Sequence, residues 1–180
     1  MIKVECNGGV HEFSSETTVG KVIKKVYGKK SGAIAALVND EEKDLSHLLL
    51  NDCKVELIDA SSKEGAYIMK HSCAHLLAQA VTELFPNAKP TIGPPIDEGF
   101  YYDFYMDPID ENDLRKIEKL MKKIIKQNIP IQREEHNNET LREMFSDNPF
   151  KIEIMDEKIG EEVGSSAYRQ GKFVDLCRGP

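Results

Sequence analysis

The sequence predicts an α+β protein of two domains, and three observations support this fold class. The 180 residues suffice for one large domain or two small ones. Segments with the period of a half-buried strand are interspersed with segments of helical periodicity. A short polar junction at residues 61–65 separates a first block from a longer second block. We therefore expect one domain at residues 1–61 and another at residues 62–180.

The composition is that of a globular protein, with 40% hydrophobic and 31% charged residues. No apolar stretch approaches the roughly 20 residues that cross a bilayer. The opening residues, MIKVEC, have a strand pattern and do not form a signal peptide. We therefore expect a cytoplasmic protein. The formal net charge of -7 argues against strong RNA binding, unless another part of a longer protein holds the RNA.

The four cysteines match neither a disulfide framework nor a CxxC metal clip. In a reducing cytosol we expect four free thiols, mostly buried. They are Cys6, Cys53, Cys73 and Cys177.

The first block has the order hairpin, helix, strand, strand. Alternation at residues 2–6, followed by Asn-Gly-Gly, predicts a hairpin. Thr17 or Thr18 can cap a helix with one apolar face, which Gly28 ends. Strands follow at 33–38 and 53–58. This is the β-grasp order of ubiquitin. The block resembles the TGS domain, a β-grasp module at the front of threonyl-tRNA synthetases and in some GTPases. Because it contains no phosphate loop or catalytic cluster, a docking or regulatory role is the default expectation.

The second block begins with a long helix and continues as an α+β domain with a mostly antiparallel sheet. The long helix covers residues 63–85 and ends before Pro86. Asp110 can cap a second helix over 111–128. We expect this helix to bury a stripe made of Leu114, Ile117, Leu120, Met121, Ile124 and Ile125. The remaining expected elements are strands at 91–95, 99–104, 131–135, 150–155 and 172–176, and a short helix at 138–145.

The strongest local feature is a pair of histidines on the long helix. His71 and His75 are four residues apart and therefore lie on one helix face. Such a pair can bind a metal ion or hold a water between two imidazoles. The alternative is a pair of partly buried structural histidines, which is the more common case. No glutamate lies between them, which excludes the HExxH motif of zinc peptidases.

Two further segments carry unusual combinations of side chains. Asp175 and Cys177 stand just before Arg-Gly-Pro at the end of a strand, where a lone cysteine would usually be core. Tyr101 and Tyr102 stand between two glycine-marked bends. On a strand these tyrosines would face opposite ways, so that one could be core and the other could open onto a pocket. Ordinary strand packing is the alternative.

Together these segments resemble the editing domain of threonyl-tRNA synthetases. The matching motifs are HSCAHLL at 71–77, IGPPIDEGFYYD at 92–103 and VDLCRGP at 174–180, and the resemblance covers essentially the whole chain. In the family, a histidine four residues after the cysteine completes the site. Here it would follow Pro180, where the chain ends. The editing domain of alanyl-tRNA synthetases shares this histidine and cysteine pattern but lacks such a β-grasp block.

The resemblance implies post-transfer editing, which is hydrolysis of the ester that joins serine to tRNA(Thr). Serine lacks one methyl group of threonine, which is worth only about 1–3 kcal/mol in a pocket, so the synthesis site admits it too often. The family match gives His71, His75, Lys151 and Cys177 to the catalytic site, with Cys177 expected to shape the pocket. From the residues alone, Lys151 would be a solvated strand lysine. Tyr102 and Asp175 match residues that bind the substrate.

The resemblance also sets the expected cofactors and partners. Two histidines and a cysteine are reasonable zinc ligands. The threonyl family resembles a metal-independent editor, whereas the alanyl relative holds zinc, so we expect no required metal. Zinc and ATP are implied only for a synthesis domain outside this chain. The expected partner is the acceptor end of tRNA(Thr) carrying serine, and the full enzyme is expected to be a homodimer through other domains.

Two alternative functions stay open from the sequence, as does the role of one lysine row. The chain could be a non-catalytic TGS or RNA-binding module, or a zinc-dependent aminoacyl-ester hydrolase of the alanyl type. A lysine row on the second helix could contact tRNA phosphates, although a solvated helix face with Glu111, Asp113 and Glu118 nearby is the more common explanation. The row consists of Lys116, Lys119, Lys123 and Lys126.

Overall fold

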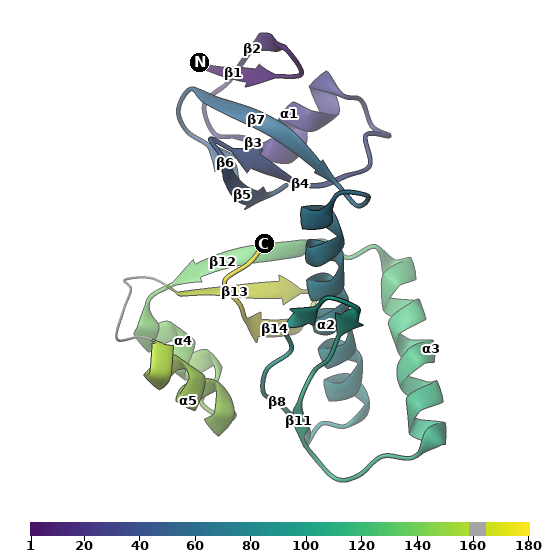
Figure 1. Cartoon of the computed structure of the whole chain (residues 1–180). Coiled ribbons are helices and arrows are strands. Elements are labelled where there is room, and N and C mark those ends of the chain that lie inside the picture. The colour runs from purple at the N-terminus through teal and green to yellow at the C-terminus, as the bar shows by residue number, and fades with distance from the viewer. Residues whose placement is uncertain (159–164) are drawn as a thin grey trace. The chain divides into compact units, whose positions relative to one another are not determined.

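The protein has a mixed α+β fold, as the sequence predicts. A computed structural model describes residues 1–158 and 165–180 (Figure 1). The chain forms two compact units, of which the first comprises Met1–Met69 with Gly179–Pro180 and the second comprises Lys70–Arg178. This division falls inside helix α2 (Lys63–Leu84). The assignment of named domains to residues 1–61 and 62–180 stays a prediction.

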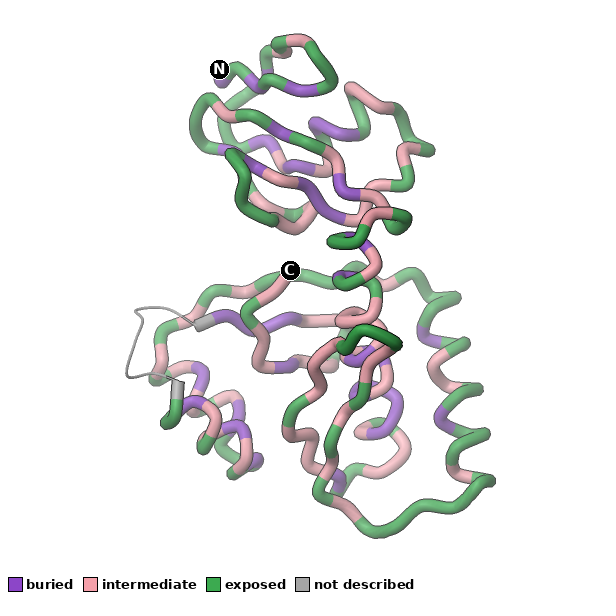
Figure 2. The backbone as a smooth tube through the Cα atoms, viewed as in Figure 1, coloured by how far each residue is buried: buried purple, intermediate pink, exposed green. Residues whose placement is uncertain are grey.

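Unit 1 is built on a five-stranded mixed sheet in the order β2-β1-β7-β4-β5. Strand β1 pairs antiparallel with β2 and parallel with β7. Every second residue of β1 is buried (Figure 2). The strands are β1 (Ile2–Cys6), β2 (Gly9–Phe13), β4 (Ala33–Val38), β5 (Glu41–Asp44) and β7 (Cys53–Asp59), and a separate pair joins β3 (Thr17–Thr18) to β6 (Leu48–Leu49). The predicted hairpin and the two predicted later strands are confirmed, whereas β3, β5 and β6 were not predicted.

Helix α1 (Val19–Val26) covers the core of unit 1 with Val19, Val22 and Ile23. It begins where the sequence predicts, because the Thr18 side chain accepts a hydrogen bond from the backbone N–H of Lys21. Gly28 has a φ of 85° just after the helix, a left-handed conformation that glycine adopts without strain.

In unit 2, helix α2 packs against helix α3 (Glu111–Gln127) through a shared apolar cluster. The predicted cap of α3 is confirmed, since Asp110 and Asp113 form a reciprocal capping box. Ile117 and Ile124 of the predicted stripe are buried. The prediction was wrong for Leu114 and Ile125, which are 55% and 61% exposed. Leu114 lies in the first turn of α3 and Ile125 in the last, and no described element covers them.

The prediction of a strand at residues 150–155 was wrong, because this segment is helix α5 (Pro149–Lys158). The Asn148 side chain accepts hydrogen bonds from the backbone N–H groups of Phe150 and Lys151, and Pro149 occupies the first helical position. Such local caps decide between a helix and a strand where a short apolar run does not. As a result Lys151 and Met155, four residues apart, are both buried.

The remaining elements of unit 2 are one sheet, two small hairpins and a short helix. The sheet has the order β12-β13-β14, all antiparallel, and its central strand β13 was not predicted. The tyrosine segment is mostly loop, so the predicted strands at 91–95 and 99–104 were too long. The elements are β8 (Lys89–Pro90), β9 (Pro95–Ile96), β10 (Gly99–Phe100), β11 (Phe104–Tyr105), β12 (Ile131–His136), α4 (Asn138–Met144), β13 (Ser165–Gln170) and β14 (Phe173–Leu176).

Helices α4 and α5 pack on strands β13 and β14 through Leu141, Phe145, Met155 and Ala167. The ion pair between Lys151 and Asp175 joins the first turn of α5 to β14. Among the described residues, no helix combines the length and the apolar character that crossing a membrane requires.

Candidate functional site

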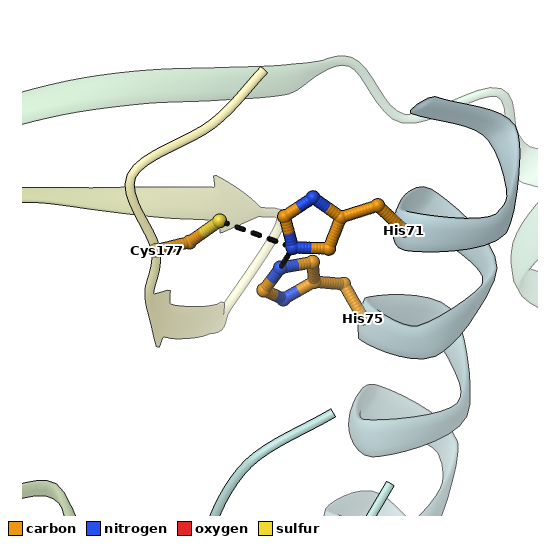
Figure 3. A group of neighbouring side chains, drawn as sticks. All are labelled: His71, His75 and Cys177. Atoms are coloured by element: carbon orange, nitrogen blue, oxygen red, sulfur yellow. Dashed lines mark hydrogen bonds between the residues drawn. The ribbon is translucent and has the colours of Figure 1, made fainter. Parts of the chain in front are cut away.

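The two histidines of α2 point at the cysteine that follows β14 (Figure 3). The Nε2 atoms of His71 and His75 are 3.2 Å apart, and Cys177 Sγ lies 3.3 Å from His71 Nε2. The helical spacing of four residues brings the two imidazoles together, with their centroids 4.9 Å apart and their planes inclined by 37°. Cys177 is held in place by Ser166, whose hydroxyl donates to the Cys177 carbonyl over 2.6 Å.

The carboxylate of Asp175 connects this cluster to the rest of unit 2. Asp175 is 1% exposed, and both of its oxygens are occupied. Its Oδ1 accepts from Lys151 Nζ at 2.6 Å and from the backbone N–H of Leu176 at 2.8 Å. Its Oδ2 accepts from the Tyr102 hydroxyl at 2.5 Å. His75 Nδ1 lies 3.0 Å from Oδ2, which is ion-pair distance, although its N–H is not aligned for a good hydrogen bond.

Lys151 is buried at 3% exposure and is therefore not the solvated strand lysine that the residues alone would suggest. Besides its ion pair with Asp175, its Nζ donates to the Tyr102 hydroxyl over 3.1 Å. A buried ammonium is tolerated when it is paired and hydrogen-bonded, and both conditions hold here.

Tyr102 reaches Asp175 because its loop is tied down and passes close to a glycine. Thr91 and Asp103 pair through their backbones at 2.9 Å, which holds the two ends of the loop together. The Tyr102 ring lies against Gly93 so closely that a Cβ on Gly93 would come within 2.2 Å of it. Tyr101, the neighbouring tyrosine, is 44% exposed, so one tyrosine enters the site and the other faces solvent.

The contacts set the charges of the site. Burial by itself would lower the pKa of His75, but Asp175 and Cys177 beside it raise that pKa from 6.5 to about 9. Burial would raise the pKa of Cys177, but His71 and His75 lower it from 9.0 to about 6. Burial would likewise raise the pKa of Asp175, but His75 and Lys151 lower it to about 2. Burial and Asp175 raise the pKa of Tyr102, which therefore stays protonated.

At neutral pH the site therefore contains an imidazolium, a thiolate, a carboxylate and an ammonium, and their charges cancel. Such a set can donate protons to a developing negative charge and can hold a polar substrate group away from bulk water. His71, His75 and Cys177 can also hold a metal ion, since their ligand atoms all lie within 4.8 Å of one another. Tetrahedral zinc would place such donor atoms about 3.3–3.6 Å apart, close to the 3.2 Å between the two histidines and the 3.3 Å between His71 and Cys177.

A cavity of about 820 Å³ adjoins this cluster within unit 2. Lys151 and Asp175 line it, whereas His71, His75 and Cys177 do not. Gln79, one turn after His75 on α2, also lines the cavity, and its buried Oε1 has no hydrogen-bond partner among the described residues. The volume of the cavity falls within the range of small-molecule sites. A ligand could therefore lie in it next to Lys151 and Asp175.

The structure brings all six predicted site residues together in unit 2. His71, His75, Tyr102, Lys151, Asp175 and Cys177 come from α2, the loop before β11, α5, β14 and the segment after it. Their chemical roles stay predictions. Sequence reasoning missed Gly93 and Ser166 as supports of the site; the close approach of a ring to Gly93 leaves no pattern in the sequence, although the glycine lies within the IGPPIDEGFYYD motif.

The lysine row of α3 is exposed, and its first member is neutralised. Lys116 Nζ pairs with Asp113 at 2.9 Å, and the neighbouring Lys122 pairs with Glu118 at 2.5 Å. The solvated-face interpretation therefore accounts for part of this surface, and contact with tRNA stays a prediction.

Comparison with known proteins identifies the family. No protein-family model matches the chain. It is 45% identical to the threonine--tRNA ligase of Thermotoga maritima, over 99% of the chain and 28% of that protein. Identity to the enzyme of Chlamydia trachomatis is 44%, over 100% of the chain and 28% of the relative. Identity to that of Thermoplasma volcanium is 48%, over 87% of the chain and 22% of the relative.

A similarity of this extent places the chain in the class of aminoacyl-tRNA synthetases. Within that class it belongs with the threonine--tRNA ligases, as the prediction from its motifs stated. The chain spans about a quarter of the length of these relatives.

We expect Gly93→Ala to disrupt the site, because the added methyl group would overlap the Tyr102 ring. Overpacking of this kind lowers the free energy of unfolding by about 1–3 kcal/mol. Urea unfolding followed by circular dichroism measures the change. Gly99→Ala is the matched control, since a Cβ there meets nothing within 4 Å and should change stability by less than about 0.5 kcal/mol. Equal stability of the two variants would contradict the close approach.

We expect the alkylation of Cys177 by iodoacetamide to rise with pH through a midpoint near 6, because the adjacent histidines favour its thiolate. Cys73 is an internal control, since burial raises its pKa above 9.0 and it should react only in more alkaline solution. Mass spectrometry of the labelled peptides separates the two residues. In His75→Ala the midpoint for Cys177 should move upward. A midpoint near 9 in the unaltered protein would show that the histidines do not stabilise the thiolate.

Proposed function

We propose that this chain carries the editing activity of a threonine--tRNA ligase and hydrolyses the ester of serine wrongly attached to tRNA(Thr), in the cytoplasm. The observation that carries the proposal is the buried cluster in which His71, His75 and Cys177 meet Asp175 and Lys151. The cluster occurs in a chain that is related to threonine--tRNA ligases over nearly its whole length. Ester hydrolysis needs a proton acceptor, a positioned water and a donor to the leaving oxygen, and this set of groups can supply them.

The charge states divide the work between the two histidines. His75, with a pKa of about 9, is an imidazolium at neutral pH and therefore acts as a proton donor or as an electrostatic stabiliser of the oxyanion. His71 has its Nε2 directed at both His75 and Cys177, so its other ring nitrogen, Nδ1, is the one left to accept a proton from the attacking water. The Cys177 thiolate stabilises the imidazolium and shapes the pocket, a role that needs no covalent intermediate.

Asp175 acts in this proposal chiefly by holding its neighbours. Its oxygens accept hydrogen bonds from Lys151, Leu176 and Tyr102, and His75 lies at ion-pair distance. Direct binding of the seryl ammonium group by Asp175 would therefore require one of these partners to move aside. Tyr102 and Lys151 are the partners most suited to release Asp175. Their side chains also bond to each other, and Lys151 lines the adjacent cavity. The substrate-binding roles of Tyr102 and Asp175 thus include an exchange of partners.

A zinc-dependent aminoacyl-ester hydrolase is the second candidate, and the spacing of the His71, His75 and Cys177 donor atoms favours it. We propose that the reaction needs no metal, because imidazolium and thiolate already neutralise each other in this cluster. A bound metal would require His75 to lose its proton.

The first test compares hydrolysis of seryl-tRNA(Thr) and threonyl-tRNA(Thr) by this chain and by a version extended a few residues beyond Pro180. We expect selective cleavage of the seryl ester, at least by the extended version. His71→Ala and His75→Ala should each lower the rate about a hundredfold or more, as removal of a general acid or base does. His11→Ala, in unit 1, is the matched control and should keep full activity.

Unchanged rates in both α2 variants would refute the roles of these histidines. A folded protein that cleaves neither ester in either version would favour the non-catalytic binding module instead.

The second test measures the zinc content of the purified protein and its activity after chelation. We expect substoichiometric zinc and unchanged activity, since the charges of the site balance without a cation. Stoichiometric zinc, together with activity that is lost on chelation and restored by zinc, would establish the zinc-dependent hydrolase. Cys177→Ser then separates the two cases further, because it should weaken metal retention only in a zinc enzyme.

A further inference from the structure

Unit 1 contains a long basic segment inside an acidic protein. Residues 17–39 include no aspartate or glutamate, whereas the whole chain has a formal net charge of -7. The segment comprises helix α1, the loop after it and strand β4. Its lysines are Lys21, Lys24, Lys25, Lys29 and Lys30. Positive charge is therefore concentrated in one place, which the net charge conceals.

The lysines stand at a hollow in the surface of unit 1. A groove of about 380 Å³ is lined by Lys24, Lys29 and Ser31, and its apolar wall is made by Ile23, Ala33 and Leu45. No carboxylate lines this groove. A cationic rim, a hydroxyl group and an apolar wall suit a ligand that combines an anionic group with a sugar or base.

The charges at this groove are not neutralised by neighbouring side chains. Over the described residues, none of Lys21, Lys24, Lys29 and Lys30 forms an ion pair with a carboxylate. Lysines elsewhere in unit 1 do so: Lys43 pairs with Glu41, and Lys54 pairs with Glu56. The groove lysines differ from Lys43 and Lys54 because their segment contains no acidic residue. Their unpaired charges give the groove a positive electrostatic potential.

The backbone beside the groove offers hydrogen-bond donors as well. Gly28 and Gly32 have φ values of 85° and 72°, and between them the chain makes a tight loop. In the part of the chain that the structure describes, the backbone N–H groups of residues 28–32 meet no acceptor. Successive free N–H groups in such loops, together with lysines, form the concavities in which proteins bind phosphate groups.

We propose that this groove binds phosphate groups of the RNA backbone, and that it is the place where unit 1 holds tRNA. The identity of the RNA rests on the proposed function, but the binding itself does not require hydrolysis. The α3 lysine row is a weaker candidate, because its first member, Lys116, is already paired with Asp113, and Glu111 and Glu118 stand on the same helix. The repeated phosphates of an RNA backbone suit the unpaired lysines at the groove of unit 1. Each phosphate that a lysine neutralises releases a condensed counterion, which favours binding.

The test measures binding of a fluorescent unacylated tRNA(Thr) transcript to the 180-residue chain by anisotropy, at salt concentrations of about 50 to 200 mM. Lys24→Gln with Lys29→Gln should weaken binding about tenfold at the lowest salt and reduce the slope of log K against log salt by about 2. The matched control is Lys43→Gln with Lys54→Gln, which removes two paired lysines from the same unit. It should leave the affinity and the slope nearly unchanged. Circular dichroism verifies that all variants fold.

Equal affinities and slopes for the groove variant and the unaltered chain would overturn the proposal, and so would an equal loss in the control. No measurable binding of the transcript by the unaltered chain would overturn it as well. Hydrolysis of seryl-tRNA separates this inference from the proposed function. A groove variant with a raised KM and an unchanged kcat supports both, whereas a chain that binds the transcript through the groove without cleaving the ester retains only the inference.

Discussion

The arrangement of unit 2 depends on one buried carboxylate. An ionised aspartate that is removed from water costs several kcal/mol unless paired charges and hydrogen bonds compensate it. Asp175 obtains this compensation from Lys151 on α5, Tyr102 in the loop before β11 and His75 on α2. Three separate segments must therefore converge on the end of β14. Removing one partner would weaken the placement of the other two, so the elements that carry the site are held together by its charge.

The same contacts decide what the side chains can do. Because Asp175 stays ionised, His75 keeps its proton, and because His75 keeps its proton, Cys177 loses its own more easily. This order of dependence underlies the proposed function, because it makes His75 the proton donor of the proposed reaction. It also bears on metal binding, since a cation would have to displace a proton from an imidazole that the carboxylate stabilises. The protonation states of His75 and Cys177 and the affinity of the site for a metal ion thus depend on the same set of charges.

Local chemistry in the sequence determined much of the fold. The Asn-Gly-Gly turn, the Thr18 and Asp110 caps and the periodicity of α2 all act within a few residues, and the structure has the hairpin and the helices that they predict. Local reasoning was wrong at residues 150–155 because the apolar run there suits a strand as well as a helix. It was also wrong for Leu114, which is 55% exposed, because the periodicity of a helix does not say whether another element lies against a given turn.

The sequence by itself determined which residue types could form a site: a histidine pair on one helix face, and motifs that match threonyl-tRNA synthetases. Only the tertiary structure decided what state these residues are in. Lys151 is buried and paired, and His71 meets a cysteine 106 residues away. The physical reason is that protonation depends on burial and on neighbouring charges. Both are set by contacts between segments far apart in the chain, which the spacing of residues within a segment does not encode.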